Sequence, residues 1–357
     1  HLDAAAGVMI SASHNPIEDN GIKFFAADGC KLPDALEDEI AGHVAAHHEL
    51  PRPKGTSVGT IVDRKRDVAA YGEHCDSLGA DLSGMTVVVD AAYGAAFDLA
   101  PRALRRLNAK VVKLHCQDDG SHINVRCGAT DLRSLTKAVA RHPGSVGVAF
   151  DGDADRALFV DEVGEVVTGD HVLAIWAKEL LVRGALPHDT VVATVMSNLG
   201  LELAIAEMGA KLLRTAVGDR YVLEAMQRGG FRLGGEQSGH IIDLDANTTG
   251  DGIATAVRLL ALAAKAGGLR VLREQMRTYP QILVNVRVDD KRCVERDGVR
   301  DAIAAAERSM DGRGRILVRP SGTEPLIRIM IEGQDEAQMR SLAQTIADKI
   351  VAAQPSA

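Results

Sequence analysis

Two segments of this chain share one order of features: an apolar run, a glycine, a helix-length stretch and a second apolar run. The first reads TVVVDAAYG and then NAKVV from Thr86, and the second reads TVVATVMSNLG and then GAKLL from Thr190. Short runs of β-branched residues predict buried strands, and a helix between two such strands favours parallel pairing. The repeat therefore predicts a duplicated α/β unit.

The rest of the chain can be divided around this repeat. We expect four domains, with boundaries at residues 1–66, 67–168, 169–275 and 276–357. The first holds an opening strand, a hairpin around Ala27-Asp28-Gly29 and a helix over 34–48, and a helix over 66–78 leads into the second. After Tyr279-Pro280 the pattern changes to alternating strands, followed by an amphipathic helix, which predicts an α+β unit. The ranges expected for these last elements are 282–288, 315–319, 327–332 and 335–352.

Composition limits the classes of function. Aromatic residues make up only 3% of the chain against 46% hydrophobic residues, so the cores must consist of Ala, Val, Leu and Ile. The formal net charge of -8 argues against a nucleic-acid groove or an anionic membrane surface. An anionic substrate would need a local basic site. The most apolar stretch, 253–264, contains Arg258 and predicts no membrane span.

The five cysteines are scattered without CxxC spacing, so we interpret them as reduced thiols and not as a disulfide framework or zinc site. With no visible signal peptide, a cytoplasmic protein is expected. The chain starts without Met in what resembles the middle of a domain, which predicts a fragment.

The most specific chemical motif is DGDADR. It follows the buried run 146–150 directly and places Asp151, Asp153 and Asp155 at alternate positions. Three carboxylates in a short loop repel one another unless they share a hard cation, so the motif indicates Mg²⁺, Mn²⁺ or Ca²⁺. An EF-hand is excluded because Arg156 stands where its glycine is required and because the residues that follow predict a hairpin. A purely structural ion is the alternative.

A hydroxyl-bearing turn stands near the start of the chain. In SASHNP, Asn15-Pro16 forces a turn after an apolar run and leaves Ser11 or Ser13 beside His14. A serine at such a turn can be a nucleophile or a phosphate carrier, although most turns of this kind only bond to nearby backbone.

Two further loops suit a sugar phosphate. In GGEQSGH, alternation would put Glu236, Ser238 and His240 on one side of an extended segment, where they could bind sugar hydroxyls. An ordinary loop is the alternative. RPSGTEP, together with the nearby Arg328, combines two arginines, two hydroxyls and backbone amides into an anion nest, although Pro-Ser-Gly is also a common turn. Its residues are Arg319, Ser321, Gly322, Thr323 and the nearby Arg328.

Together these four segments, in this order, resemble the α-D-phosphohexomutase superfamily over nearly the whole chain. Four motifs resemble those of the branch that converts glucosamine 6-phosphate into glucosamine 1-phosphate: SASHNP-x-x-DNGIK, DGDADR, VGDRYV and GEQSGH. The resemblance implies a multi-domain α/β fold: three related α/β units, the first incomplete here, and a C-terminal α+β domain around a central cleft. The product would feed UDP-N-acetylglucosamine and cell-wall synthesis.

The resemblance also implies residue roles. Ser13 would carry the phosphoryl group and, with Asp151, Asp153 and Asp155, hold one Mg²⁺. Lys23 and His240 would assist proton transfer, and glucosamine 1,6-bisphosphate would be the intermediate. Glu236 and Ser238 would bind the sugar, and the RPSGTEP residues with Arg328 would bind the second phosphate. Further substrate contacts are expected at His14, Arg156 and Arg220.

Some expectations stay open. A glucose or mannose phosphate is the alternative substrate, and a catalytically silent sugar-phosphate binder is disfavoured because the serine and all three aspartates are present. Members of the superfamily begin with a further arginine-bearing segment, so we do not expect this fragment to be active by itself. We expect a monomer or a homodimer, with a phosphorylated hexosamine as substrate.

Overall fold

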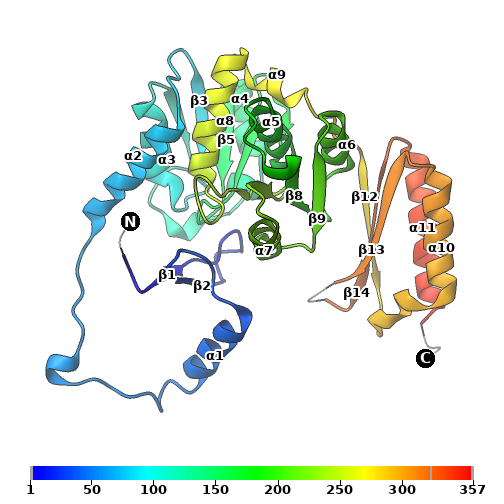
Figure 1. Cartoon of the computed structure of the whole chain (residues 1–357), viewed down its shortest axis with the longest axis horizontal. Helices are drawn as coiled ribbons and strands as arrows, with labels where there is room; N and C mark the ends of the chain where they lie inside the picture. The colour runs from blue at the N-terminus through cyan, green and yellow to red at the C-terminus, as the bar shows by residue number, and fades with distance from the viewer. Residues whose placement is uncertain (1–2, 322–323, 355–357) are drawn as a thin grey trace.

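The structure, a computed structural model, describes residues 3–321 and 324–354 of the chain. Strands among these residues form four separate sheets of two, five, four and three strands in chain order. Figure 1 shows the two middle sheets in a central body, with the N-terminal ribbon to one side and the C-terminal sheet at the far end. The predicted multi-domain α/β class is confirmed.

The N-terminal sheet is a ribbon of two antiparallel strands, β1 (Ala6–Ile10) and β2 (Ile22–Ala26). The SASHNP segment lies in the loop between them. The hairpin expected at 27–29 is reduced to a tight turn closed by one bridge, Phe25 to Lys31. Helix α1 (Asp34–Ala45) ends three residues before the predicted limit. Residues 46–64 then run outward as a mostly exposed strap with one 3₁₀ turn, Gly55–Ser57 (Figure 1).

The second unit is a five-stranded sheet in the order β4-β3-β5-β6-β7, with β3, β4 and β5 parallel. Strands β3 and β5 are almost completely buried, as expected for parallel strands with helices on both faces. The elements of this unit are 3₁₀ turn Lys65–Asp67, α2 (Val68–Leu78), β3 (Thr86–Asp90), α3 (Ala96–Arg106), β4 (Lys110–Leu114), 3₁₀ turns Gly120–His122 and Gly128–Thr130, α4 (Arg133–Ala140), β5 (Val146–Phe150), β6 (Ala157–Val160) and β7 (Val166–Val167).

The third unit repeats this topology. Its order β9-β8-β10-β11 corresponds to β4-β3-β5-β6, with two parallel pairs followed by an antiparallel one. The predicted duplication is therefore confirmed at the level of strand order. The elements are α5 (Gly169–Val182), 3₁₀ turn Pro187–Asp189, β8 (Thr190–Thr194), α6 (Leu199–Glu207), β9 (Lys211–Thr215), α7 (Asp219–Gly229), β10 (Leu233–Gly235) and β11 (Ile241–Asp243).

Helix α8 (Gly252–Ala266) crosses between these units. It follows the third sheet in sequence, within the expected domain 169–275, yet it packs against α2, α3 and β6 of the second unit. Its apolar residues join one core shared by both sheets. The short helix α9 (Leu269–Arg273) follows it. Within the described residues, no helix has the length and apolar character needed to cross a bilayer.

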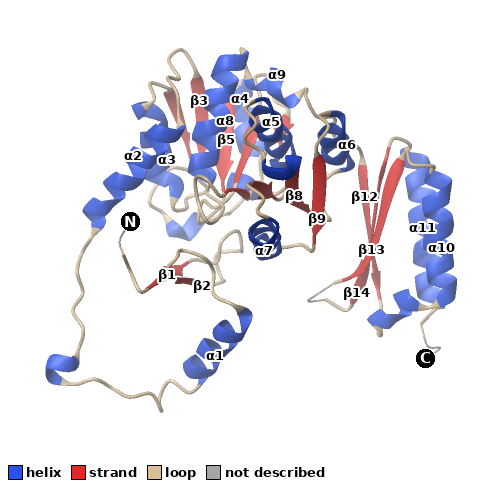
Figure 2. Ribbon diagram, in the orientation of Figure 1, coloured by secondary structure: helices blue, strands red, loops and turns tan. Residues whose placement is uncertain are grey.

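The C-terminal unit has its own core. An antiparallel sheet in the order β12-β14-β13 is covered by two helices, as Figure 2 shows. The alternating burial along β12 matches the predicted half-exposed strands. The elements are β12 (Gln281–Arg287), 3₁₀ turn Lys291–Glu295, α10 (Asp297–Met310), β13 (Gly314–Pro320), β14 (Leu326–Gly333) and α11 (Glu336–Ala352).

Candidate active site

Three loops at equivalent positions in the first three units form the site. Each joins a strand to an antiparallel partner: residues 11–21 between β1 and β2, 151–156 between β5 and β6, and 236–240 between β10 and β11. The second and third loops are bridged at Arg156 and His240. The first and second pack so closely that a Cβ on Gly152 would lie 2.4 Å from the Ser13 carbonyl oxygen. One repeated hairpin thus brings three separate motifs together.

Ser13 is the hydroxyl that faces the carboxylates. Its Oγ donates a hydrogen bond to Asp151 Oδ2 at 3.1 Å and lies 3.3 Å from His14 Nδ1. The backbone at Ser13 has a φ of 55°, in the left-handed region that a β-carbon disfavours. Ser11 supports this turn, because its Oγ accepts the Ser13 N–H at 2.9 Å. The geometry therefore distinguishes the two serines that the turn motif by itself left open.

The three aspartates converge. One oxygen each from Asp151, Asp153 and Asp155 lies within 4.8 Å of the others. Asp153 Oδ1 and Asp155 Oδ1 are buried and have no hydrogen-bond partner among the described residues. Burial, and then the charges of the other two, raise the pKa of Asp151 to about 7. Buried and mutually repelling carboxylates, two of whose oxygens accept no hydrogen bond from the described residues, fit a hard divalent cation such as Mg²⁺. The strands β6 and β7 after the loop rule out an EF-hand helix.

Lys23 provides a positive charge beside this cluster. From β2, its Nζ pairs with Asp153 and lies 3.5 Å from Asp155 Oδ2. Burial alone would lower the pKa of Lys23, but the hydrogen bond to Asp153 and the two carboxylate charges raise it. Lys23 is therefore a cation here.

His240 connects helix α7 to the loop over residues 151–156, which is called the metal loop below. Its Nδ1 lies 3.5 Å from Asp155 Oδ2 and its Nε2 lies 3.5 Å from Asp219 Oδ2. The Gly250 N–H donates to Nε2 at 3.1 Å, so Nε2 is an acceptor and Nδ1 is the nitrogen that can donate toward Asp155. Burial works to raise the pKa of Asp155, but His240, Lys23 and Arg156 together lower it well below its usual range.

Arg156 and His14 lie beside the three aspartates. Arg156 Nε is 3.9 Å from both Asp151 Oδ2 and Asp155 Oδ1. Burial, and then the charge of Arg156, lower the pKa of His14. Arg220, at the start of α7, donates to Glu224 one turn along the helix.

The predicted geometry of the GEQSGH segment is wrong. It is a tight turn and not an extended strand: Gly239 N–H donates to the Glu236 carbonyl at 3.0 Å, and Gly239 has a φ of 95°. Alternation therefore does not align the three side chains. Glu236 Oε1 accepts the Gly218 N–H at 3.1 Å, and Ser238 Oγ is buried with no hydrogen-bond partner in the described part of the chain.

The basic loop is the RPSGTEP segment, residues 319–325, where β13 ends and β14 begins. Arg319 on β13 and Arg328 on β14 are direct cross-strand partners. Burial, and then the charge of Arg328, lower the pKa of Arg319. Ser321 is buried, with its carbonyl held by Lys291 Nζ at 2.6 Å. Gly322 and Thr323 lie outside the described residues.

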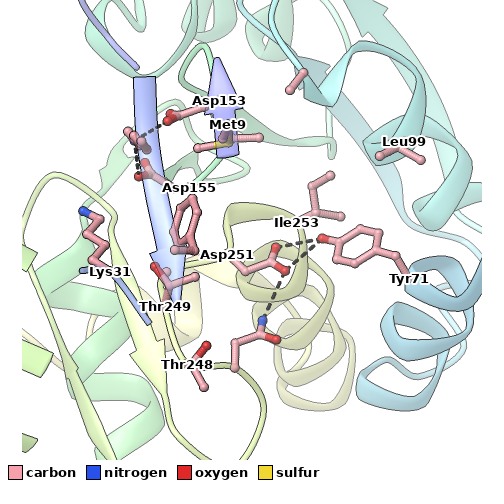
Figure 3. Close-up of a pocket in the computed structure, with 16 residues that line it drawn as sticks. Met9, Lys31, Tyr71, Leu99, Asp153, Asp155, Thr248, Thr249, Asp251 and Ile253 are labelled. Atoms are coloured by element: carbon pink, nitrogen blue, oxygen red, sulfur yellow. Dashed lines mark hydrogen bonds and ion pairs between the residues drawn. The ribbon is translucent and has the colours of Figure 1, made fainter. Parts of the chain in front are cut away.

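A cavity of about 370 Å³ opens beside the metal loop, where the first three units meet. Figure 3 shows Asp153 and Asp155 facing it on one side and Tyr71 and Asp251 on the other. Tyr71 donates to both oxygens of Asp251, at 2.8 and 3.0 Å, which joins α2 to the start of α8.

Comparison with known proteins agrees with this arrangement. Family profiles for phosphoglucomutase/phosphomannomutase match the chain in four parts: alpha/beta/alpha domains I, II and III at residues 1–50, 70–164 and 168–281, and the C-terminal domain at 283–349. A phosphoglucosamine mutase of Symbiobacterium thermophilum is 53% identical over 353 residues, which cover 98% of this chain and 79% of that protein. The chain belongs to the phosphoglucosamine mutase family. A phosphoglucosamine mutase of Frankia alni is 51% identical over 357 residues, which cover 99% of this chain and 78% of that protein.

Solved structures share the fold with the phosphoglucosamine mutase family. A phosphoglucomutase/phosphomannomutase family protein of Burkholderia thailandensis matches with a TM-score of 0.80 at 22% identity, over 99% of this chain and 77% of that one. The N-acetylphosphoglucosamine mutase of Aspergillus fumigatus, solved with GlcNAc-6P and magnesium, matches with a TM-score of 0.76 at 17% identity, over 99% and 90%. The prediction of the α-D-phosphohexomutase superfamily is confirmed.

Sequence reasoning did not identify several residues that the structure places beside the loops of this phosphoglucosamine mutase family member. Asp219 lies within the VGDRYV motif quoted above, so that motif could have identified this residue. Lys31 pairs with Asp219 from the turn after β2. Asn124, which holds the Ser13 loop, and Lys291 carry no local signal, because their partners lie far away in the sequence.

Proposed function

We propose that this chain interconverts glucosamine 6-phosphate and glucosamine 1-phosphate by phosphoryl transfer to and from Ser13, through glucosamine 1,6-bisphosphate. The observation that carries the proposal is Ser13 Oγ, held 3.1 Å from Asp151 Oδ2 at the edge of a convergent carboxylate cluster. A hydroxyl in that position can carry a phosphoryl group whose oxygens complete a metal site.

Asp151, Asp153 and Asp155, together with a phosphate oxygen on Ser13, would hold one Mg²⁺. When bound, the ion neutralises negative charge on the transferred phosphoryl group, which is most of what this chemistry requires. In the forward direction the P–O bond to Ser13 breaks as a bond to the sugar O1 hydroxyl forms, and the hydroxyl proton passes to Ser13 Oγ. The bond between O6 and phosphorus then breaks as Ser13 Oγ bonds to that phosphorus, and the Ser13 hydroxyl proton passes to O6.

We assign the proton movement to Lys23 and His240. Both contact Asp155 Oδ2, at 3.5 Å each, so they meet beside the same carboxylate from separate units. The Lys23 ammonium also stabilises charge on the phosphoryl oxygens. Proton transfer by positioned side chains of this kind contributes a rate factor of about 10²–10⁴.

The sugar and its second phosphate would be bound by the other two loops. Ser238 Oγ and the remaining acceptor lone pairs of the Glu236 carboxylate can form hydrogen bonds with sugar hydroxyls. Arg319, Ser321 and Arg328, with Gly322 and Thr323, would hold the phosphate that is not reacting. His14, Arg156 and Arg220 would complete the substrate contacts. This basic loop explains how an acidic protein can bind an anionic sugar.

The test is phosphorylation of the protein by glucosamine 1,6-bisphosphate with Mg²⁺, followed by intact-mass measurement. Wild type should gain one phosphoryl group, and EDTA should prevent the gain. Ser13→Ala should gain none, whereas Ser11→Ala, two residues away, should still accept the group. A phosphoryl group on Ser13→Ala would contradict the role of Ser13.

The substrate is tested separately. Turnover on glucosamine 6-phosphate should exceed turnover on glucose 6-phosphate and mannose 6-phosphate. A preference for glucose 6-phosphate or mannose 6-phosphate would leave the proposed mechanism standing and contradict the proposed substrate.

A further inference from the structure

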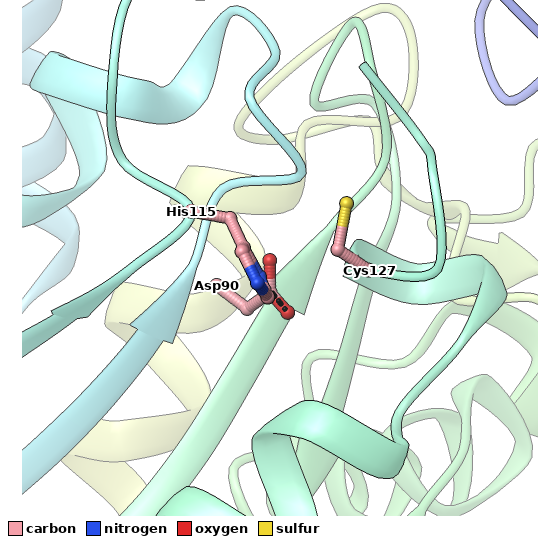
Figure 4. A group of neighbouring side chains, drawn as sticks. All are labelled: Asp90, His115 and Cys127. Atoms are coloured by element: carbon pink, nitrogen blue, oxygen red, sulfur yellow. Dashed lines mark ion pairs between the residues drawn. The ribbon is translucent and has the colours of Figure 1, made fainter. Parts of the chain in front are cut away.

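A second cluster of ligand-type side chains lies at the carboxyl edge of the five-stranded sheet. Asp90 is the last residue of β3, His115 directly follows β4, and Cys127 comes from the loop beyond (Figure 4). We propose that Asp90, His115 and Cys127 form a binding site for a transition-metal ion, of the class to which Zn²⁺ belongs, separate from the all-carboxylate site.

The topology brings these residues together. Strand β3 has β4 on one side and β5 on the other, so the connection from β3 to β4 and the connection from β4 to β5 run in opposite directions across the sheet. In open parallel sheets, ligands bind outside the carboxyl ends of strands at such a reversal. Asp90 stands at that point, in register with Leu114, and His115 is the next residue.

The three side chains are close enough to share an ion. One ligand atom from each lies within 4.8 Å of the other two. His115 Nδ1 is 3.1 Å from Asp90 Oδ2. Asp90 and Cys127 are completely buried, and the His115 side chain is 19% exposed, which leaves one direction open to solvent.

The cluster contains unsatisfied ligand atoms. Asp90 Oδ1 accepts the Ala92 N–H at 3.0 Å. By contrast, Asp90 Oδ2 and His115 Nδ1 are buried and make no well-oriented hydrogen bond to a described residue, although they face each other as an ion-pair contact at 3.1 Å. A buried polar atom without a partner costs free energy, and a bound cation would remove that cost for both atoms.

The chemistry of the donor set selects the ion. One imidazole nitrogen, one thiol and one carboxylate match the ligands of Zn²⁺, which takes three protein side chains and a water molecule at open sites. Mg²⁺ prefers oxygen ligands alone, as at Asp151, Asp153 and Asp155. When Zn²⁺ binds, the Cys127 thiol loses its proton to solvent and a sulfur–metal bond forms.

The position of the cluster indicates a structural role. The loop that carries Cys127 also carries Asn124, whose Nδ2 donates to the carbonyl oxygens of Ser13 at 2.8 Å and Asn15 at 3.2 Å. An ion bound by Cys127 and by the ends of β3 and β4 would hold the loop of Asn124 and Cys127 against the serine loop, residues 11–21. No local motif predicts such a site, because the ligands come from two strand ends and a loop.

The test uses Co²⁺ as a spectroscopic probe of the metal-stripped protein, with excess Mg²⁺ to occupy carboxylate sites. Wild type should bind one Co²⁺ with a thiolate-to-cobalt charge-transfer band that Zn²⁺ abolishes. Cys127→Ser should lack the band. Cys116→Ser, which removes a neighbouring buried thiol, should retain it. The absence of the band in wild type, or its persistence in a folded Cys127→Ser protein, would overturn the proposal.

A second variant decides the matter if Cys127→Ser does not fold. His115→Gln retains the thiol and changes a partly exposed side chain, so folding should survive. Its Zn²⁺ affinity, measured by calorimetry in excess Mg²⁺, should fall by more than about 100-fold, beyond the loss from removing an outer partner. Unchanged Zn²⁺ affinity in His115→Gln would overturn the proposal. Neither readout depends on mutase turnover, so failure here leaves the proposed function intact.

Discussion

The amide of Asn124 holds the carbonyl groups on either side of His14 and so fixes the turn that presents Ser13. Both residues adopt left-handed backbone, with φ values of 55° at Ser13 and 60° at Asn124. Strained backbone of this kind persists only where the surroundings enforce it. The two hydrogen bonds from Asn124 are that enforcement, because they join the serine loop to the second unit.

Asn124→Gly removes the amide while keeping the left-handed backbone free of strain. We expect phosphorylation of Ser13 by glucosamine 1,6-bisphosphate to slow about 10-fold to 100-fold, since each lost bond is worth about 1 kcal/mol. Quenched-time intact-mass spectra measure the rate. Asn108→Gly is the matched control: Asn108 has a φ of 68° and bonds to Asp81 at the surface. Equal rates in the two variants would show that Asn124 does not position the serine.

At this scale, prediction from sequence depended on whether a residue sits in a local motif. The three aspartates form a short pattern whose chemistry can be predicted in isolation, whereas Ser13 was predicted only from the resemblance of the whole set of motifs. The structure places all four residues together. Asn124 could not be predicted, since only the folded chain brings it to Ser13. The alternation argument for Glu236 assumed extended backbone, and the left-handed Gly239 makes a turn instead.

At the scale of elements, the repeated hairpins depend on backbone packed directly against backbone. The N-terminus of α3 contacts the metal loop, where Ala95 N–H donates to the Gly152 carbonyl at 2.8 Å. A Cβ on Gly94 would lie 2.4 Å from that same oxygen and 2.7 Å from the Gly152 Cα. The close approach of α3 to this loop therefore requires glycine at position 94.

Gly94→Ala should push the metal loop away from α3. We expect a loss of about 1–3 kcal/mol in the free energy of unfolding, the usual cost of overpacking, and weaker Mg²⁺ binding. Thermal denaturation and calorimetric titration with Mg²⁺ measure the two effects. In Gly298→Ala on α10, the new Cβ meets no atom within 4 Å, so neither quantity should fall. Wild-type Mg²⁺ affinity in Gly94→Ala would contradict this account.

The strands of the repeat were predictable because β-branched runs bounded by turn residues have few alternative structures. Several helices were not. Helix α8 is buried around nearly its whole circumference, so its sequence lacks the contrast between polar and apolar faces that marks a surface helix. Its packing against the preceding unit depends on tertiary contacts, and no local pattern encodes that choice.

At the scale of the whole molecule, a buried polar network joins the third unit to the C-terminal sheet. Asn198 Nδ2 donates to the Tyr279 carbonyl at 3.0 Å and to Glu332 Oε1 at 3.1 Å. Arg315 pairs with Glu332 and donates to the Ser197 carbonyl at 2.9 Å. The basic loop between β13 and β14 is thus held to the body through the other end of its sheet.

Asp170 is the buried acid of this junction. Its Oδ2 accepts the Asn198 N–H at 2.8 Å, while Oδ1 is buried without a hydrogen-bond partner in the described residues. Burial raises the pKa of Asp170 from 3.8 to about 6, against the opposing effects of the Asn198 N–H and Arg214. Between these values the folded chain binds more protons than the unfolded chain. The stability that Asp170 contributes is therefore present below about pH 4 and is lost as pH rises through 6.

Asp170→Asn should remove this loss, because the amide oxygen can still accept the Asn198 N–H and cannot ionise. At pH 7 we expect the variant to be more stable than wild type by up to about 3 kcal/mol, and near pH 4 the difference should vanish. Thermal midpoints of both proteins from pH 4 to pH 7 measure the difference. Burial lowers the pKa of the adjacent His171 to about 4, which makes a pH slope of opposite sign, but that slope is common to both proteins and cancels. Asp38→Asn, on exposed α1, should show no such difference, and a constant offset between Asp170→Asn and wild type at every pH would contradict the assignment.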